Sequence, residues 1–156
     1  MKNLKDKIQS VVDIYKIGNL LKAEQNCKQL IHENPKVAFL YNLLGLVLAG
    51  QKKFDEAIKY YEEGLLIDPN FSIIYNNLGL LFAQGEYKND FKKAENYYKK
   101  SISINDKLFE PYNNLGSLYN SLLRYDDAVY YYKESIQKNK EFSHAYYNLE
   151  IGRASL

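Results

Sequence analysis

This sequence of 156 residues is poor in the features that mark exported or membrane-spanning proteins. Its single cysteine, Cys27, excludes an intrachain disulfide, and a reducing compartment such as the cytoplasm is therefore predicted. Four charged residues stand among the first nine, and the first ten residues contain no apolar run of signal-peptide length. No stretch approaches the roughly 18 unbroken apolar residues of a membrane helix. The sequence therefore predicts no export and no membrane partner.

Charge of one sign is also lacking, since 21 basic and 19 acidic residues leave a formal net charge of +2. Only two arginines are present, and this absence disfavours phosphate or base recognition. The third quarter of the chain is rich in lysine, but acidic residues interleave with the lysines: Lys88, Lys92, Lys93, Lys99, Lys100 and Lys107. A solvated face is the favoured interpretation, with an RNA or acidic-partner patch as the alternative. No nucleic-acid partner is predicted.

The residue types that carry catalysis are scarce and dispersed. The two histidines, His32 and His144, are far apart in the chain, and paired His and Cys at zinc spacing are absent. No Gly-rich loop followed by Lys-Ser or Lys-Thr is present to hold a phosphate. Cys27 is interpreted as a small core residue rather than a nucleophile, and His32 as a surface residue near a helix end. We expect no enzyme activity, no metal and no cofactor.

An internal repeat is the strongest positive signal. The pairs Leu44-Gly45, Leu78-Gly79 and Leu115-Gly116 recur at intervals of 34 and 37 residues. Two further columns keep the same spacing: Ala23, Ala57, Ala94 and Ala128, and Cys27, Tyr61, Tyr98 and Tyr132. We predict close backbone approach at the small residues, with the tyrosines as wedges between helices.

Apolar residues at three- and four-residue steps predict that each repeat is a hairpin of two helices. The three extra residues of the third repeat are placed in the polar run 85–90, with Asp90 as an N-cap. The predicted helices span 4–16, 20–33, 37–50, 54–67, 71–85, 90–104, 108–122, 125–138 and 142–152.

The pattern of Tyr41, Leu44-Gly45, Ala57, Tyr61 and Pro69 resembles the tetratricopeptide repeat family, whose signature places these residue types at these spacings. The resemblance implies an all-α fold, a right-handed α-α superhelix of about four hairpins with a C-terminal capping helix. A single domain over 1–156 is expected to contain a degenerate repeat (1–37), a second repeat (38–71), a third with the insertion (72–108), a fourth (109–142) and the capping helix (143–156).

The first repeat departs from the family pattern, since Ser10 and Val11 stand where Leu-Gly is expected. It fits better if the turn between its two helices is one residue short, with Ile8, Val11 and Tyr15 in the apolar positions.

In this family the first helices of the hairpins line a concave groove, and the resemblance therefore implies a peptide-binding site on them. The groove positions are Phe39, Asn42, Leu43, Leu46, Ile73, Asn76, Asn77, Leu80, Glu110, Asn113, Asn114, Ser117, His144, Tyr147 and Asn148. A carboxamide can donate to a carbonyl and accept from an amide of an extended segment. The asparagines are interpreted as ligand contacts, with solvated polar filler as the alternative. In this respect the chain resembles the tetratricopeptide arm of protein O-glycosyltransferases, which carries a similar column of asparagines.

The predicted function is a non-catalytic scaffold that binds a protein or peptide segment in this groove. A clamp for a terminal carboxylate is not expected, because Ile73, Asn77, Glu110 and Asn114 occupy the positions where that subclass carries cations. Glu110 would repel an anionic end, so the groove is expected to favour neutral or basic segments. A recruiting arm of a larger enzyme, such as a glycosyltransferase or sulfotransferase, is the alternative function. Self-association through the C-terminal helix is a further hypothesis.

Overall fold

The structure is a computed structural model that describes residues 3–84 and 89–156. In these ranges all regular secondary structure is helical, which confirms the predicted all-α class. Every predicted helix is present, with ends within two residues of the prediction: α1 (Leu4–Lys16), α2 (Leu20–Glu33), α3 (Ala38–Gly50), α4 (Phe54–Ile67), α5 (Ser72–Ala83), α6 (Phe91–Ile104), α7 (Glu110–Ser121), α8 (Tyr125–Lys138) and α9 (Ser143–Ala154). The predicted insertion at 85–90 falls largely on positions 85–88, outside the described residues.

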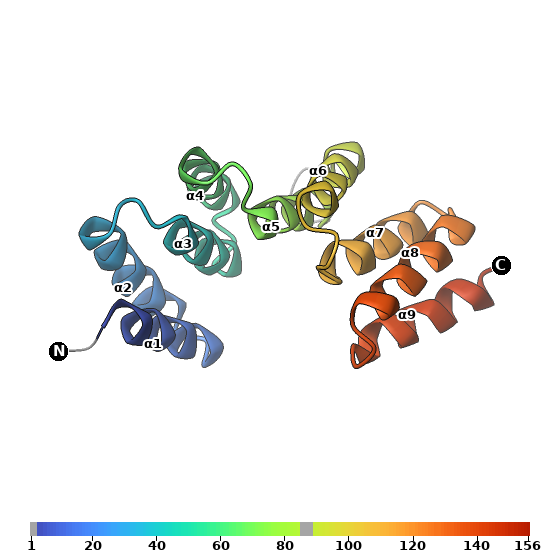
Figure 1. Cartoon of the computed structure of the whole chain (residues 1–156), viewed down its shortest axis with the longest axis horizontal. Helices are drawn as coiled ribbons and strands as arrows, with labels where there is room; N and C mark the ends of the chain where they lie inside the picture. Colours follow the sequence, from blue (N-terminus) through green and yellow to red (C-terminus); the bar gives the residue numbers. More distant parts are fainter. Residues whose placement is uncertain (1–2, 85–88) are drawn as a thin grey trace. The chain divides into compact units, whose positions relative to one another are not determined.

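The chain divides into two compact units, Met1–Ile74 and Tyr75–Leu156. In the first unit α1 pairs with α2 and α3 with α4, and α2 also packs against α3 (Figure 1). In the second unit α7 pairs with α8, α6 packs against α7, and α9 lies against α8 and α7 (Figure 1). Each unit is thus built of helical hairpins that stack on their neighbours.

One residue between the two helices of each hairpin adopts a left-handed backbone conformation. The φ angles are +82° at Gly18, +62° at Lys52, +46° at Asn89 and +60° at Leu123. These positions follow the same 34- and 37-residue intervals as the sequence columns, so this feature recurs in all four repeats. The predicted shortening of the first turn is wrong, because α1 and α2 are separated by the same number of residues as α3 and α4.

Asparagine and aspartate side chains cap three of the helices. Oδ1 of Asn3, Asn19 and Asp90 accepts the backbone N–H three residues later, at 2.9, 3.2 and 3.0 Å. Such a cap satisfies one of the N–H groups that the first helical turn leaves unpaired. The Asp90 cap predicted from the sequence is confirmed.

A tyrosine ring lies directly on a glycine in the second, third and fourth repeats. A methyl group at Gly79 would lie 2.6 Å from Cε1 of Tyr98, and one at Gly116 would lie 2.5 Å from Cδ1 of Tyr132. Tyr61 covers Gly45 in the same way. Because the ring occupies the volume of the absent side chain, the two helices of each hairpin approach more closely than larger residues would permit.

In the first repeat the residue sizes in these two columns are reversed. Val11 stands in the glycine column and Cys27 in the tyrosine column, and both are buried. The Cys27 thiol donates to the carbonyl oxygen of Leu40 at 3.3 Å, and burial raises the pKa of this thiol to about 12. The group is therefore a protonated core residue, as its interpretation from the sequence required.

A second set of tyrosines forms ring pairs across each of the later hairpins. The ring centroids are 6.5 Å apart in Tyr41–Tyr60, 6.4 Å in Tyr75–Tyr97 and 6.5 Å in Tyr112–Tyr131. The Tyr41 hydroxyl donates to the carbonyl of Pro35 at 3.0 Å, and the Tyr112 hydroxyl donates to the carbonyl of Asp106 at 3.3 Å. In the second and fourth repeats these hydroxyls tie the hairpin to the turn that precedes it.

Glu24 anchors α2 to the turn after α3. The residue is only 8% exposed, and its carboxylate accepts from Lys28 Nζ at 2.6 Å, Gln51 Nε2 at 2.7 Å and Lys53 Nζ at 3.0 Å. The Lys28 hydrogen bond, supported by those from Gln51 and Lys53, outweighs burial and lowers the pKa of Glu24 to about 2. In the third repeat, burial would raise the pKa of Glu95, but hydrogen bonds from Lys99 and Tyr119 outweigh it and lower that pKa.

Replacing Gly45 by alanine should destabilise the protein by about 1–3 kcal/mol, because the methyl group would overlap ring carbons of Tyr61. Gly50→Ala is the matched control on the same helix, since its methyl group would meet only ordinary contacts, 3.4 Å or more from Leu20 and Tyr15. The control is expected to be neutral or stabilising by up to about 1 kcal/mol. Urea unfolding measures both; equal effects would refute the close tyrosine contact.

Glu24→Gln should lower the free energy of unfolding at pH 7 by about 1–2 kcal/mol. The folded-state pKa of Glu24 lies below its ordinary value, so this stabilisation is present above about pH 4.5 and is lost as the pH falls towards 2. Urea unfolding of both proteins between pH 7 and pH 3 should show the difference shrinking. A difference that stays constant over this range, or an equal loss in the exposed control Glu62→Gln, would contradict the assignment.

Candidate binding surface on the first helices

Asparagine side chains on the first helices of the second unit hydrogen-bond to one another. Nδ2 of Asn114 on α7 donates to Oδ1 of Asn76 on α5 at 2.9 Å. Nδ2 of Asn148 on α9 donates to Oδ1 of Asn113 on α7 at 3.1 Å. In each bond the acceptor is the first residue of an Asn-Asn pair, and the donor stands one column later in the following repeat. The bonded asparagines belong to two different sequence columns. Aligning the repeats compares equivalent positions, so it does not reveal contacts between positions that are not equivalent.

These pairs leave hydrogen-bonding capacity on each carboxamide. An asparagine side chain has two N–H donors and an oxygen with two lone pairs, and each pair uses one donor and one acceptor site. The remaining groups of Asn113, Asn114 and Asn148, which are half-buried, can reach water or a ligand. The asparagines therefore hold neighbouring helices together and present polar groups at the same time.

The residues predicted to line the groove differ widely in exposure. Asn42, Leu43, Asn76 and Asn77 retain only 3–7% of their exposure, so they support the surface more than they form it. The remaining members are half-buried or exposed: Phe39, Leu46, Ile73, Leu80, Glu110, Asn113, Asn114, Ser117, His144, Tyr147 and Asn148. A ligand can touch this second group without any rearrangement of the core.

In the second unit, three of the predicted residues line one hollow of about 150 Å³. Leu80 of α5 meets Asn114 and Ser117 of α7, and the rings of Phe91 and Tyr98 complete the wall. The Ser117 hydroxyl accepts a hydrogen bond from the Tyr132 hydroxyl at 3.3 Å. The predicted residues of α5 and α7 are thus brought together here with aromatic residues that the sequence had assigned only to packing or left unassigned.

The first unit carries the apolar members of the predicted set. Phe39 and Ile73 are exposed, and the ring of Phe39 lies 6.5 Å from that of Phe71. Asn42, Leu43 and Leu46 belong to the same helix as Phe39, α3. This part of the surface offers mainly apolar contact.

The charge of the surface in the second unit comes from Glu110, which is exposed in the first turn of α7. His144 is exposed on α9 and stacks on Phe142, with ring centroids 5.9 Å apart. Phe142 in turn lies 4.6 Å from Phe109. An exposed carboxylate is suited to a neutral or basic ligand.

The residues considered for catalysis are not brought together. Cys27 is fully buried, whereas His32 is exposed in the last turn of α2, as predicted. Over residues 3–84 and 89–156, no group of three or more His, Cys, Asp or Glu side chains could hold a metal ion. In the same ranges, no helix combines the length and the apolar character needed to cross a membrane.

Family comparisons agree with the repeat pattern. Residues 38–71 and 73–108 each match a family described as tetratricopeptide repeat. Residues 94–151 match a third family, the Est1 DNA/RNA binding domain. A curated relative, the uncharacterized protein ycf37 of Pyropia yezoensis, is 39% identical over 67 residues, which are 42% of this chain. The matched part is about a third (35%) of that relative's length.

Solved structures share the fold at low sequence identity. A thermophilic TPR protein of Thermus thermophilus, TTC0263, is 18% identical with a TM-score of 0.82, covering 92% of this chain and 78% of its own. The first TPR of Spaghetti (RPAP3) bound to the HSP90 peptide SRMEEVD is 20% identical with a TM-score of 0.69, covering 76% of this chain and 92% of its own. The repeat columns and the two tetratricopeptide matches lead to one conclusion: the chain belongs to the tetratricopeptide repeat family.

Proposed function

We propose that this chain is a non-catalytic scaffold that binds a segment of a partner protein on the exposed face of its first helices. The observation that carries the proposal is the asparagine ladder of the second unit, where Asn113, Asn114 and Asn148 keep unused donors and acceptors. Such groups can bind the backbone of an extended segment without requiring a particular sequence. The peptide carried by the RPAP3 structure supports a peptide ligand in this fold.

The ligand is expected to be neutral or basic. Glu110 stands exposed at the start of α7, and none of the predicted groove residues is a lysine or arginine. An acidic segment would meet repulsion from this carboxylate with no cation in the row to offset it. The hollow beside Leu80 and Ser117 offers a place for one small apolar side chain of the ligand.

The test ligand is a peptide selected from a random library for binding to the wild-type protein. A double variant, Asn114→Ala with Asn148→Ala, should lower the affinity for this peptide by about 10–30-fold. Two hydrogen bonds worth about 1 kcal/mol each account for this loss. Affinity is measured by fluorescence polarisation well below the unfolding temperature of each variant, because Asn76 and Asn113 lose their partners.

Lys92→Ala with Lys133→Ala is the matched control, since both side chains lie on the second helices α6 and α8, outside the first-helix row. It should leave affinity unchanged. If the control weakens binding as much as the asparagine variant does, or if the asparagine variant binds normally, the ligand does not lie on the first helices.

Nucleic acid is the competing ligand class, because residues 94–151 match the Est1 DNA/RNA binding domain. The charges of α6 argue against it. Lys99 is paired with Glu95, Lys93 Nζ lies 4.3 Å from the ring centroid of Phe82, and Lys100 Nζ lies 6.0 Å from that of Tyr75. These cations are engaged within the protein, and the formal net charge of +2 supplies little long-range attraction to phosphates.

We therefore expect a fluorescent single-stranded RNA or DNA of about 20 nucleotides to bind with a Kd no tighter than about 100 µM at roughly 150 mM salt. Fluorescence polarisation over a range of salt concentrations measures this. A different result would contradict the proposal: a Kd below about 1 µM that rises steeply with salt, with binding abolished by Lys92→Glu with Lys93→Glu. The proposed ligand would then be a nucleic acid and not a protein segment.

Two further proposals concern the ends of the array. In the second unit α9 leaves Tyr146 and Ile151 more than 40% exposed, so self-association through this helix remains a hypothesis. The role of a recruiting arm in a larger enzyme also remains a proposal.

A further inference from the structure

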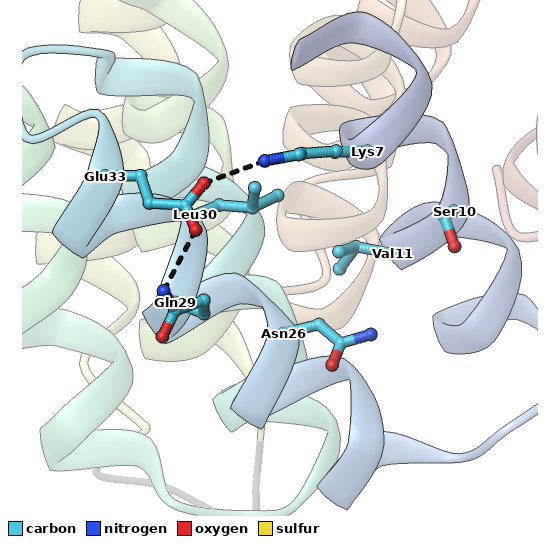
Figure 2. A pocket seen from close by; sticks show the side chains of 7 residues that line it. All are labelled: Lys7, Ser10, Val11, Asn26, Gln29, Leu30 and Glu33. Carbon is cyan, nitrogen blue, oxygen red and sulfur yellow. Dashed lines mark hydrogen bonds and ion pairs between the residues drawn. The ribbon is translucent and has the colours of Figure 1, made fainter. Parts of the chain in front are cut away.

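The first unit contains a pocket of about 300 Å³ between α1 and α2, and none of the predicted groove residues lines it. It is lined by Lys7, Ser10, Val11, Asn26, Gln29, Leu30 and Glu33 (Figure 2). Val11 and Leu30 are buried and form an apolar floor. Lys7 Nζ donates to Glu33 Oε2 at 2.9 Å, and Gln29 Nε2 donates to Glu33 Oε1 at 2.9 Å, which closes one side of the rim (Figure 2).

The repeat register explains why this space is empty. Lys7 stands in the column of Tyr41, Tyr75 and Tyr112, and Asn26 stands in the column of Tyr60, Tyr97 and Tyr131. In each of the other three repeats these two columns hold a pair of tyrosine rings with centroids 6.4–6.5 Å apart. The first repeat therefore keeps the helical frame of the ring pair but lacks both rings.

We propose that this pocket binds the side chain of a tyrosine from a partner polypeptide. The occupant follows from the chain itself, because the same frame accommodates tyrosine rings three times. A ring placed here would lie on Val11 and Leu30, as a buried aromatic ring requires.

The polar groups of the rim suit a phenol. The Asn26 carboxamide and the Ser10 hydroxyl both line the pocket, and neither has a hydrogen-bond partner among the described residues. Asn26 can accept from the phenol hydroxyl or donate to it, and Ser10 can do the same. The Lys7–Glu33 ion pair is neutral as a pair, so it does not select a charged ligand. A phenylalanine ring would leave these polar groups unpaired.

The site is tested with two probes, p-cresol and N-acetyl-tyrosinamide, titrated into the ¹⁵N-labelled protein and followed by NMR. Both should shift the amide signals of Val11 and Leu30 in a saturable manner, with a Kd on the order of 1–10 mM for ligands of this size. Lys7→Tyr with Asn26→Tyr rebuilds the ring pair; it should weaken both probes at least tenfold and raise the unfolding temperature. Asn26→Tyr alone, which fills half of the space, covers the case in which the double variant does not fold.

Lys22→Tyr with Gln25→Tyr is the matched control, because it adds the same rings to exposed positions of α2. It should leave both affinities unchanged. The proposal is overturned if the probes bind equally to the wild type and to Lys7→Tyr with Asn26→Tyr. It is also overturned if p-cresol binds and N-acetyl-tyrosinamide does not, since the pocket would then exclude a ring attached to a backbone. The groove variant Asn114→Ala with Asn148→Ala should bind both probes normally, so failure of the groove and failure of this pocket are distinguishable.

Discussion

The contact of a tyrosine ring with a glycine on the facing helix is the constraint on which the hairpins depend. Gly45, Gly79 and Gly116 lie inside helices, where glycine is unfavourable by about 1 kcal/mol relative to alanine. The ring packed on each glycine offsets this cost through close helix contact. In the first repeat the equivalent columns hold Val11 and Cys27, both buried, so a larger residue stands in the glycine column and a smaller one in the tyrosine column.

A second level of organisation comes from polar contacts between elements. Glu24 joins α2 to the turn after α3 with two hydrogen bonds, from Gln51 and Lys53, and Glu95 in the same column joins α6 to Tyr119 of α7. On the first helices the asparagines join α5 to α7 and α7 to α9. Under the proposed function, binding and stability would be coupled on that face, since one carboxamide would serve both a neighbouring helix and the ligand.

Departures from the repeat are as informative as the repeat. Where tyrosines pair in three hairpins, the first hairpin has Lys7 and Asn26, and both line a pocket between its two helices. Where cations would clamp an acidic peptide, this chain has Asn77, Asn114 and an exposed Glu110. Both differences lie outside the alanine column and the two columns of the glycine–tyrosine contact, which pack the hairpins, so they alter the surface without altering the helical frame.

The sequence by itself determined the helices and their ends to within two residues, because these follow from periodicity and from short-range turn chemistry. The family followed from the resemblance carried by the repeat columns. Only the tertiary structure decided which members of the first-helix row are exposed, that the asparagines bond to each other across repeats, and that the first turn has the same length as the second. The first two of these features depend on distances between side chains far apart in the chain. Aligned repeats contain no information on these distances. Asn76 and Asn114 stand in neighbouring columns, so their hydrogen bond could be identified only from the tertiary structure.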